Sequence, residues 1–350
     1  MAPDRERTPI VTDGQFISGV PSPDETRFEL SLRPSRFEEF VGQGQVKENL
    51  QVYIQAARQR DDVLDHVLFS GPPGLGKTTL SHLIADALNT HLHASTGPAL
   101  DRPADLVGIL TNLQRGDVLF IDEVHRLGPA VEEYLYAAME DFRVDVIIDA
   151  GPSARSISLD VPPFTLVGAT TREGLLTRAF RARFGVVERL EFYPADDLVQ
   201  IILRSAGILG IPVEPDAAAL MAGCARGTPR VANRILRRVR DLAQVKESDR
   251  ITLEIARRGL GMLGIDEHGL CELDRQVLRA VARGGATPVG VKTVAVTVGE
   301  TEDTIEEVYE PYLIREGYLQ KTPRGRIVTP AARRVLGTPP GEGQTRLFSE

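Results

Sequence analysis

The sequence predicts an α/β core built on a parallel sheet, followed by a small all-helical domain and a C-terminal winged helix. Between residue 28 and about 190, short apolar runs alternate with helical patterns, which is typical of a parallel sheet covered on both faces. The runs lie at 66–70, 117–122 and 164–170. From about 195 to 262 the apolar spacing is helical. Helical patterns after 263 then lead into a strand–turn–strand pattern at 318–329, which indicates a winged helix.

These patterns divide the chain of 350 residues, which is too long for one ordinary domain, into segments. The expected segments are a flexible arm at 1–27, a large α/β domain at 28–192, a small helical domain at 193–262, a winged-helix domain at 263–336 and a disordered tail at 337–350. The arm and tail are expected because both are polar and aperiodic.

Composition limits the function classes. The formal net charge is −8, so any surface that binds nucleic acid must be a local basic patch. The two cysteines, Cys224 and Cys271, lie far apart, which gives no support for a zinc site or a disulfide framework. The N-terminus lacks the apolar stretch of a signal peptide, and no apolar run approaches the length of a membrane span. We expect a cytoplasmic protein without membrane contact.

The stretch GPPGLGKTTL at 71–80 predicts a phosphate-binding loop. Its GxxxxGK[ST] pattern is formed by Gly71, Gly74, Gly76, Lys77 and Thr78. In such a loop the backbone N–H groups surround phosphate oxygens, the lysine reaches the β- and γ-phosphates, and the threonine hydroxyl serves Mg²⁺. An apolar run precedes the loop and an apolar stripe at helical spacing follows it, which is the strand–loop–helix context that the pattern requires.

Two further groups suit hydrolysis of a nucleoside triphosphate. Asp122 and Glu123 end a buried run, where one carboxylate can serve Mg²⁺ and the next can polarise the attacking water. Thr170 and Thr171 end another run, where a hydroxyl can orient that water. Arg181 and Arg183 follow in a helical segment. Judged from the residues alone, solvated surface charge is the simpler interpretation of these two arginines.

In this order the pieces resemble the AAA+ ATPases and, within them, the motors of bacterial Holliday-junction branch migration. The resemblance spans about 30 to 330 and is carried by SLRPSRFEEFVGQ (31–43), GPPGLGKTTL, LFIDEVHRL (119–127), GPSARSISLDVPPFTLVGATTR (151–172), RARFG (181–185), GTPRVANRILRRVRD (227–241) and LQKTPRGR (319–326). It implies an AAA+ core with a helical lid, ATP and Mg²⁺ as ligands, and a ring of six identical subunits.

The resemblance also implies roles for individual residues. The implied catalytic set is Lys77, Asp122, Glu123, Thr171 as sensor hydroxyl, Arg183 as a finger acting on a neighbour's ATP, and Arg230 as second sensor in the lid. The implied nucleotide contacts add Leu32, Arg33, Gly74, Gly76, Thr78, Thr79, Tyr193 and the segment Glu140, Asp141 and Phe142. The implied metal ligands are Thr78 and Asp122.

Two surfaces are expected to meet partners. The segment 144–160 reads as a projecting hairpin and resembles the element that docks on a RuvA-like junction-binding protein, with Ile157 and Leu159 on one face. From sequence alone, both side chains also fit the core of a covered strand. The basic turn with Lys321, Arg324 and Arg326 is expected to follow DNA phosphates without reading bases, although a solvated turn has the same composition.

The leading hypothesis is an ATP-driven translocase that pulls duplex DNA at four-way junctions, with a RuvC-like resolvase as a further candidate partner. The main alternative is an ATP-dependent loader or switch that binds DNA without moving on it. The letters DEVH at 122–125 also match a DExH helicase, but the second α/β domain of that class is missing. A base-reading regulator is disfavoured because its candidate recognition helix, 290–299, carries one lysine among small residues.

Overall fold

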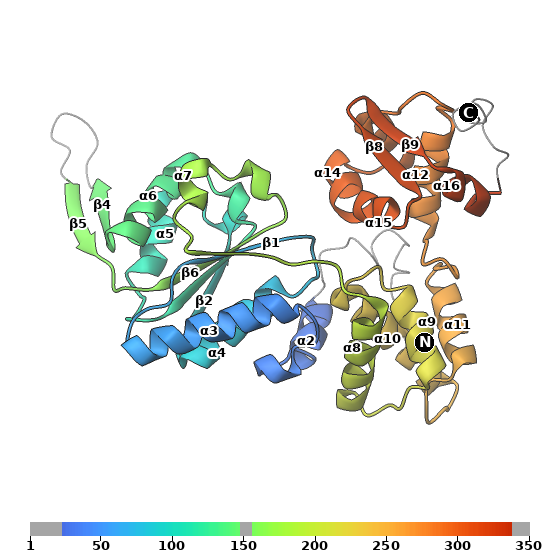
Figure 1. Ribbon diagram of the computed structural model, residues 1–350, viewed down its shortest axis with the longest axis horizontal. Helices are drawn as coiled ribbons and strands as arrows, with labels where there is room; N and C mark the ends of the chain where they lie inside the picture. The colour runs from blue at the N-terminus through green and yellow to red at the C-terminus, as the bar shows by residue number, and fades with distance from the viewer. Residues whose placement is uncertain (1–22, 148–155, 338–350) are drawn as a thin grey trace, which may run out of the picture. The chain divides into compact units, whose positions relative to one another are not determined.

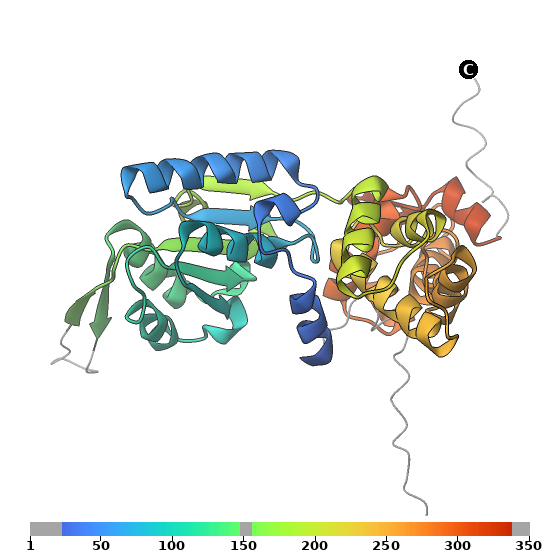
Figure 2. The ribbon, with the colours of Figure 1, turned by 90° about the horizontal axis from the view of Figure 1, so that it is seen from below.

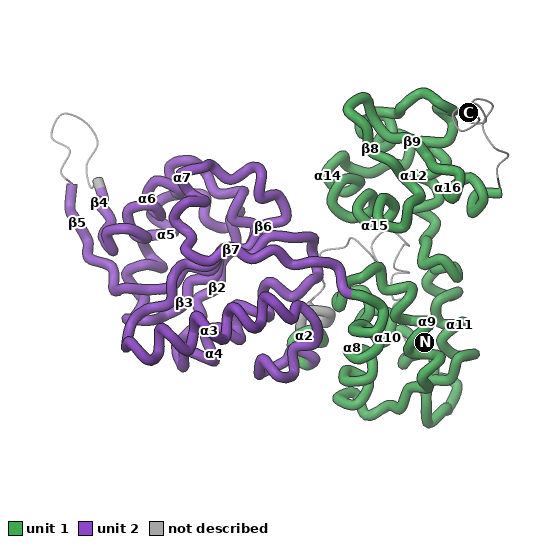
Figure 3. Tube along the Cα trace, in the orientation of Figure 1, with its two compact units in different colours: residues 1–31, 194–350 green, residues 32–193 purple. Residues whose placement is uncertain are grey.

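The computed structural model describes residues 23–147 and 156–337, and the chain forms two compact units (Figure 1). One unit is 32–193 and the other joins 1–31 to 194–350 (Figure 3). The chain therefore passes between the units twice, after residues 31 and 193. The first 22 residues of the expected arm, the turn of the expected hairpin at 148–155 and the tail from 338 lie outside the described residues.

The unit 32–193 is built on a parallel sheet of five strands in the order β2-β3-β6-β1-β7. These are β1 (Val67–Ser70), β2 (Leu92–Thr96), β3 (Val118–Asp122), β6 (Thr165–Thr170) and β7 (Val186–Arg189). The three apolar runs of the sequence are the central strands β1, β3 and β6. The parallel α/β prediction is confirmed, while β2 and β7 were not expected.

Helices cover both faces of this sheet (Figure 1). One face packs on α5 (Pro103–Leu110), α6 (Pro129–Glu140) and α7 (Arg178–Arg181), with Leu68, Ile121 and Leu166 in the shared core. On the other face lie α3 (Gly44–Arg60) and α4 (Lys77–Leu88). Short 3₁₀ turns complete the unit: η1 (Phe37–Glu39), η2 (Gly97–Ala99), η3 (Val124–Arg126) and η4 (Glu173–Leu175).

A hairpin leaves the body of this unit, as Figure 2 shows at its edge. Its strands β4 (Arg143–Ile147) and β5 (Ser156–Asp160) pair antiparallel, with Ile157 opposite Val146 and Leu159 opposite Val144. The base of the hairpin is anchored because Val144 is buried in the core beneath α6.

The second unit begins with α2 (Pro23–Ser31) and continues as four helices: α8 (Ala195–Ile208), α9 (Pro215–Gly223), α10 (Pro229–Val245) and α11 (Leu253–Met262). Helix α10 is strongly amphipathic and buries Val231, Ile235 and Val239. Helix α2 lies against the arginine-rich side of α10, where the guanidinium of Arg237 stacks on the ring of Phe28 at 4.8 Å. The segment that sequence patterns assign to an arm is therefore helical from Pro23.

The rest of this unit is the predicted winged helix. Its helices are α12 (Glu272–Ala282), α13 (Val291–Val298), α14 (Glu302–Thr304), a π-helical turn η5 (Ile305–Tyr309), α15 (Glu310–Arg315) and α16 (Pro330–Val335). The wing is the antiparallel pair β8 (Leu319–Thr322) and β9 (Gly325–Val328), which Val289 extends by a bridge to Arg326. Within the described residues, no helix is both long and apolar enough to cross a membrane.

Candidate nucleotide site and basic wing

The phosphate loop and both predicted polar groups lie at one edge of the sheet. Strands β3, β6 and β1 are neighbours, and because all three are parallel, their carboxyl ends share an edge. The loop 71–78 follows β1, Asp122 ends β3 and Thr170 ends β6. This edge is where open α/β sheets bind ligands.

The glycines of the phosphate loop adopt positive φ angles, which favour glycine over other residues. Gly76 has φ +100° and lies directly before α4, whose first residue is Lys77, so the helix N-terminus faces the loop. A Cβ on Gly76 would lie 3.1 Å from the ring of Phe40. The Lys77 ammonium donates to the carbonyls of Gly71 and Pro72 at 2.7 and 2.8 Å. Gly74 also has a positive φ, +80°, and Thr78 and Thr79 stand in the first turn of α4.

The acidic pair stands on a sharp turn at the end of β3. The Glu123 N–H donates to the Asp122 carboxylate at 2.9 Å, and Glu123 has φ +50°. A Cβ on Gly97 would lie 2.4 Å from the Glu123 carbonyl, so only glycine fits beneath this turn. The Glu123 carboxylate pairs with Arg126 at 3.0 Å. Sequence reasoning missed this ion pair.

The two threonines after β6 have different surroundings. Thr170 is buried; its hydroxyl lies 3.0 Å from His125 Nδ1 and accepts from the Arg172 N–H at 3.0 Å. The Thr171 hydroxyl is buried, and no described residue forms a hydrogen bond with it. An unsatisfied buried hydroxyl beside a phosphate loop suits a water or phosphate oxygen. The geometry therefore favours Thr171 over Thr170 as the sensor.

Arg183 is held against its own unit. Its guanidinium lies 4.3 Å from the centroid of the Tyr136 ring, donates to the Ala179 carbonyl at 2.7 Å and pairs with Glu140 at 3.2 Å. Arg181 instead forms an exposed pair with Glu173. One residue of the expected nucleotide segment, Glu140, therefore contacts the arginine. Asp141 caps the C-terminus of α6, and Phe142 packs edge-on against Phe164.

Three of the expected nucleotide contacts, Leu32, Arg33 and Tyr193, lie at the two ends of the unit 32–193. Leu32 is buried at the start of the unit, and Tyr193 is buried at its end, where its hydroxyl donates to the Leu75 carbonyl of the loop at 3.2 Å. Burial, and then the positive charge of Arg33, lowers the pKa of His82 on α4. Sequence patterns alone did not indicate that His82 belongs to this neighbourhood.

Arg230 lies in the other unit, in the first turn of α10. Its guanidinium is 3.5 Å from the carboxylate of Glu29 on α2, and Arg234 lies 3.9 Å from the same carboxylate. Glu29 was missed by sequence reasoning because it lies about 200 residues away along the chain, in the segment assigned to the large α/β domain.

The three basic residues of the wing differ in exposure. Arg324 is exposed in the turn between β8 and β9. The Lys321 side chain is 50% exposed and pairs with Glu306 at 3.0 Å. Arg326 is only 6% exposed and pairs with Glu306 and Glu310 at 2.6 and 2.5 Å. The acidic segment before the wing therefore holds one of the expected DNA-binding side chains inside the domain.

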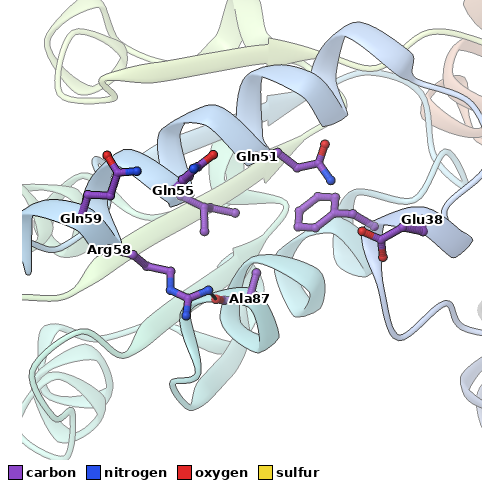
Figure 4. A pocket seen from close by; sticks show the side chains of 8 residues that line it. Glu38, Gln51, Gln55, Arg58, Gln59 and Ala87 are labelled. Atoms are coloured by element: carbon purple, nitrogen blue, oxygen red, sulfur yellow. Dashed lines mark hydrogen bonds between the residues drawn. The ribbon is translucent and has the colours of Figure 1, made fainter.

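The two expected partner-binding residues of the hairpin also differ. Ile157 is 47% exposed, whereas Leu159 is partly buried against the core beneath α6. A surface groove of about 650 Å³ lies elsewhere, along α3 (Figure 4). Its walls include Gln51, Gln55 and Arg58 and none of the predicted nucleotide contacts, so the groove is separate from the site.

Comparisons with protein families cover this whole arrangement. The description "Holliday junction DNA helicase RuvB P-loop domain" matches residues 32–190, "RuvB AAA lid domain" matches 193–266, and "RuvB C-terminal winged helix domain" matches 267–337. The boundaries follow the change from α/β core to helices and from helices to winged helix.

Relatives match over most of their length. The chain is 59% identical to the Holliday junction branch migration complex subunit RuvB of Myxococcus xanthus, covering 88% of this chain and 90% of that one. Identity to the subunit of the same name from Prosthecochloris aestuarii is 57%, covering 94% and 96%. The solved RuvB Holliday junction branch migration motor of Thermotoga maritima superposes with a TM-score of 0.81 at 47% identity, covering 88% and 99%. The chain therefore belongs to the RuvB family of AAA+ P-loop ATPases.

Proposed function

We propose that this protein is a cytoplasmic, ATP-driven motor that pulls duplex DNA and moves the crossover of Holliday junctions. The observation that carries the proposal is the meeting of the phosphate loop, Asp122–Glu123 and Thr171 at one sheet edge, in a chain that also has a basic wing. The phosphate loop, the acidic pair and the threonine serve ATP hydrolysis. The basic wing serves DNA binding that does not depend on base sequence. The names of the relatives supply the junction as the substrate.

The positions of the side chains support the following catalytic roles. The loop N–H groups and the ammonium of Lys77 bind the phosphates, and the Glu123 carboxylate accepts a proton from the attacking water while the Thr171 hydroxyl orients it. Mg²⁺ would be held by Thr78 and Asp122, where it would neutralise charge on the β- and γ-phosphates. Leu32 and Arg33 would contact the adenine side of the nucleotide, and Tyr193, whose hydroxyl donates to the Leu75 carbonyl of the loop, would line the nucleotide pocket.

The remaining roles require other subunits or the lid. In a ring of six subunits, Arg183 reaches the ATP of the neighbouring subunit. Glu140, which pairs with Arg183, lies at the same interface. Arg230, in the lid, binds a phosphate of the nucleotide once its ion pair with Glu29 is broken. The exposed Ile157 of the hairpin docks on a RuvA-like partner, and a RuvC-like resolvase acts on the same junction.

The test of the motor is strand exchange on a synthetic four-way junction with homologous arms. We expect the crossover to move with ATP and a RuvA-type protein, and to stay in place with a non-hydrolysable analogue or with Lys77→Ala. ATP turnover and DNA binding without crossover movement would favour the loader alternative. Normal turnover by Lys77→Ala would refute the nucleotide site.

The DNA contact is tested separately. Replacing Lys321 and Arg324 with alanine should weaken duplex binding and flatten its dependence on salt, because fewer counterions are released. Arg326 is left in place, because it is buried and pairs with Glu306 and Glu310. Arg324→Ala alone should reduce the salt slope by about one unit, since its side chain is exposed in the turn. An unchanged slope in the double variant would place the DNA contact elsewhere.

A further inference from the structure

Arg183 is held on three sides by its own unit. The Tyr136 ring covers one face of the guanidinium, with 4.3 Å from the Cζ atom to the ring centroid. The Ala179 carbonyl accepts from one Nη at 2.7 Å, and Glu140 pairs with the other at 3.2 Å. The side chain remains 21% exposed. Its Nε is buried and has no hydrogen-bond partner among the described residues.

Tyr136 is itself fixed at the far end of its ring. Its hydroxyl contacts the Glu132 carboxylate on α6 and the Thr177 hydroxyl, the latter at 2.8 Å. Thr177 caps α7 by accepting from the Phe180 N–H at 3.1 Å. The ring also packs against Phe180 at a centroid distance of 5.6 Å. One side chain thus touches both ends of the short segment 177–183 that carries the arginine.

We infer that Tyr136 is a positioning residue for the arginine finger: its ring holds the Arg183 guanidinium in the plane in which it meets a neighbouring subunit's ATP. An arginine side chain loses considerable rotamer freedom when it is fixed, and the ring offsets that cost before the phosphate arrives. The inference rests on the proposed role of Arg183 in trans.

The ring suits this task better than the carboxylate of Glu140 does. Glu140 binds a guanidinium nitrogen that a phosphate would also use, so the two compete, and the Glu140 side chain is 56% exposed, which weakens the pair. The ring contacts the guanidinium without accepting a hydrogen bond from its nitrogens, so it does not compete with phosphate oxygens for those donors. The contact with Tyr136 can therefore persist through hydrolysis, whereas the contact with Glu140 must be exchanged.

Three variants of the full chain distinguish the effect of the aromatic ring on turnover from the effect of its hydroxyl and from a general loss of side-chain volume. Tyr136→Leu should lower the kcat for ATP about three- to tenfold with KM nearly unchanged, because ordering of the finger is lost and ATP binding is not. Tyr136→Phe should retain most of kcat, since the ring remains. Tyr134→Leu is the matched control: Tyr134 is on the same helix and packs on the same core, but no described cation lies over its ring. It should behave as wild type.

Several results would overturn the inference. An unchanged kcat in Tyr136→Leu would do so, as would an equal loss in Tyr136→Phe, which would assign the effect to the hydroxyl. A rise in KM together with a lower unfolding temperature would indicate a merely structural role.

Mixed rings separate this inference from the proposed function. In a 1:1 mixture of Tyr136→Leu with Glu123→Gln, about a quarter of the interfaces join an intact base to an intact finger, so turnover should exceed the mean of the two parents. A mixture of Arg183→Ala with Glu123→Gln serves as the reference. If the reference fails to recover, the finger does not act in trans and the proposed function fails at that point. If only the Tyr136→Leu mixture fails, the finger stands and the positioning role is wrong.

Discussion

Thr170 and Thr171 are chain neighbours whose hydroxyls have opposite environments. The Thr170 hydroxyl is used within the protein, between His125 and the Arg172 N–H, whereas the Thr171 hydroxyl is buried without a hydrogen bond to any described residue. Sequence reasoning placed both at the nucleotide, since both follow a buried strand. The family resemblance already implied Thr171 as the sensor, and the side-chain geometry gives a physical reason to prefer it over Thr170.

We therefore expect Thr171→Val to separate stability from turnover. Valine is nearly isosteric with threonine and removes a buried, unsatisfied hydroxyl, so the free energy of unfolding should stay unchanged or rise by about 1 kcal/mol. The kcat for ATP should fall, because the water loses its orienting group. Urea unfolding and steady-state ATP hydrolysis measure the two effects.

Thr170→Val is the matched control for this prediction. It should lower the free energy of unfolding by about 1–3 kcal/mol, because the Arg172 N–H loses its acceptor. Equal destabilisation by the two substitutions would mean that Thr171 is also a structural residue.

At the scale of elements, the central strands were predictable and the edge strands were not. The residues of β1 are buried throughout, and so are those of β6, so their sequences are continuous apolar runs. Strands β2 and β7 lie at the two edges, are partly exposed and contain polar residues such as His93 and Glu188. Such short mixed runs carry little periodic signal, so the sheet was under-predicted at both sides.

The wing illustrates a second limit on what the sequence could indicate. The segregation of acids at 300–310 and bases at 320–334 was visible, and it predicted a basic surface. It did not indicate that the π-helical turn η5 and the start of α15 would place Glu306 and Glu310 against Arg326. Part of the basic charge therefore anchors the wing to the domain, because a buried guanidinium needs paired carboxylates.

This anchor predicts a pH dependence. Two hydrogen bonds, a larger contribution from Lys321 and a smaller one from Arg326, lower the pKa of Glu306 from its usual value of 4.5. A lowered pKa in the folded state stabilises the fold at pH values above 4.5, and this contribution disappears as pH falls through the lowered value. The difference in unfolding free energy between wild type and Glu306→Gln should therefore be constant near neutrality and shrink below pH 4.5.

Urea unfolding over a series of pH values measures this difference. Glu267→Gln, at a carboxylate that is 86% exposed in the same domain, controls for the loss of one negative charge. A difference that grows as pH falls would contradict the anchor.

At the scale of the whole molecule, the lid and the winged helix belong to one compact unit, although sequence patterns separate them at about residue 263. A buried ion pair joins them. Arg226, in the loop before α10, forms a bidentate pair with Asp274 of α12, and their side chains are 4% and 0% exposed. The guanidinium also stacks on Tyr312 at 4.8 Å, and Arg315 donates to the Arg226 carbonyl at 3.2 Å. No local pattern predicts such a pair, because its members lie in different domains.

This pair predicts how the two units respond to one substitution. Asp274→Asn should destabilise the unit of lid and winged helix by about 3–5 kcal/mol, because it leaves the Arg226 charge buried without its counter-ion. Asp249→Asn is the control: it removes the counter-ion of Arg250 within the lid, but both side chains are more than half exposed, so the transition should hardly change. In scanning calorimetry of the full chain, Asp274→Asn should lower the transition of that unit and leave unchanged the transition that ATP raises, which belongs to 32–193. If both transitions fall together, the two units unfold as one. The ion pair then stabilises the whole molecule and not only the unit of lid and winged helix.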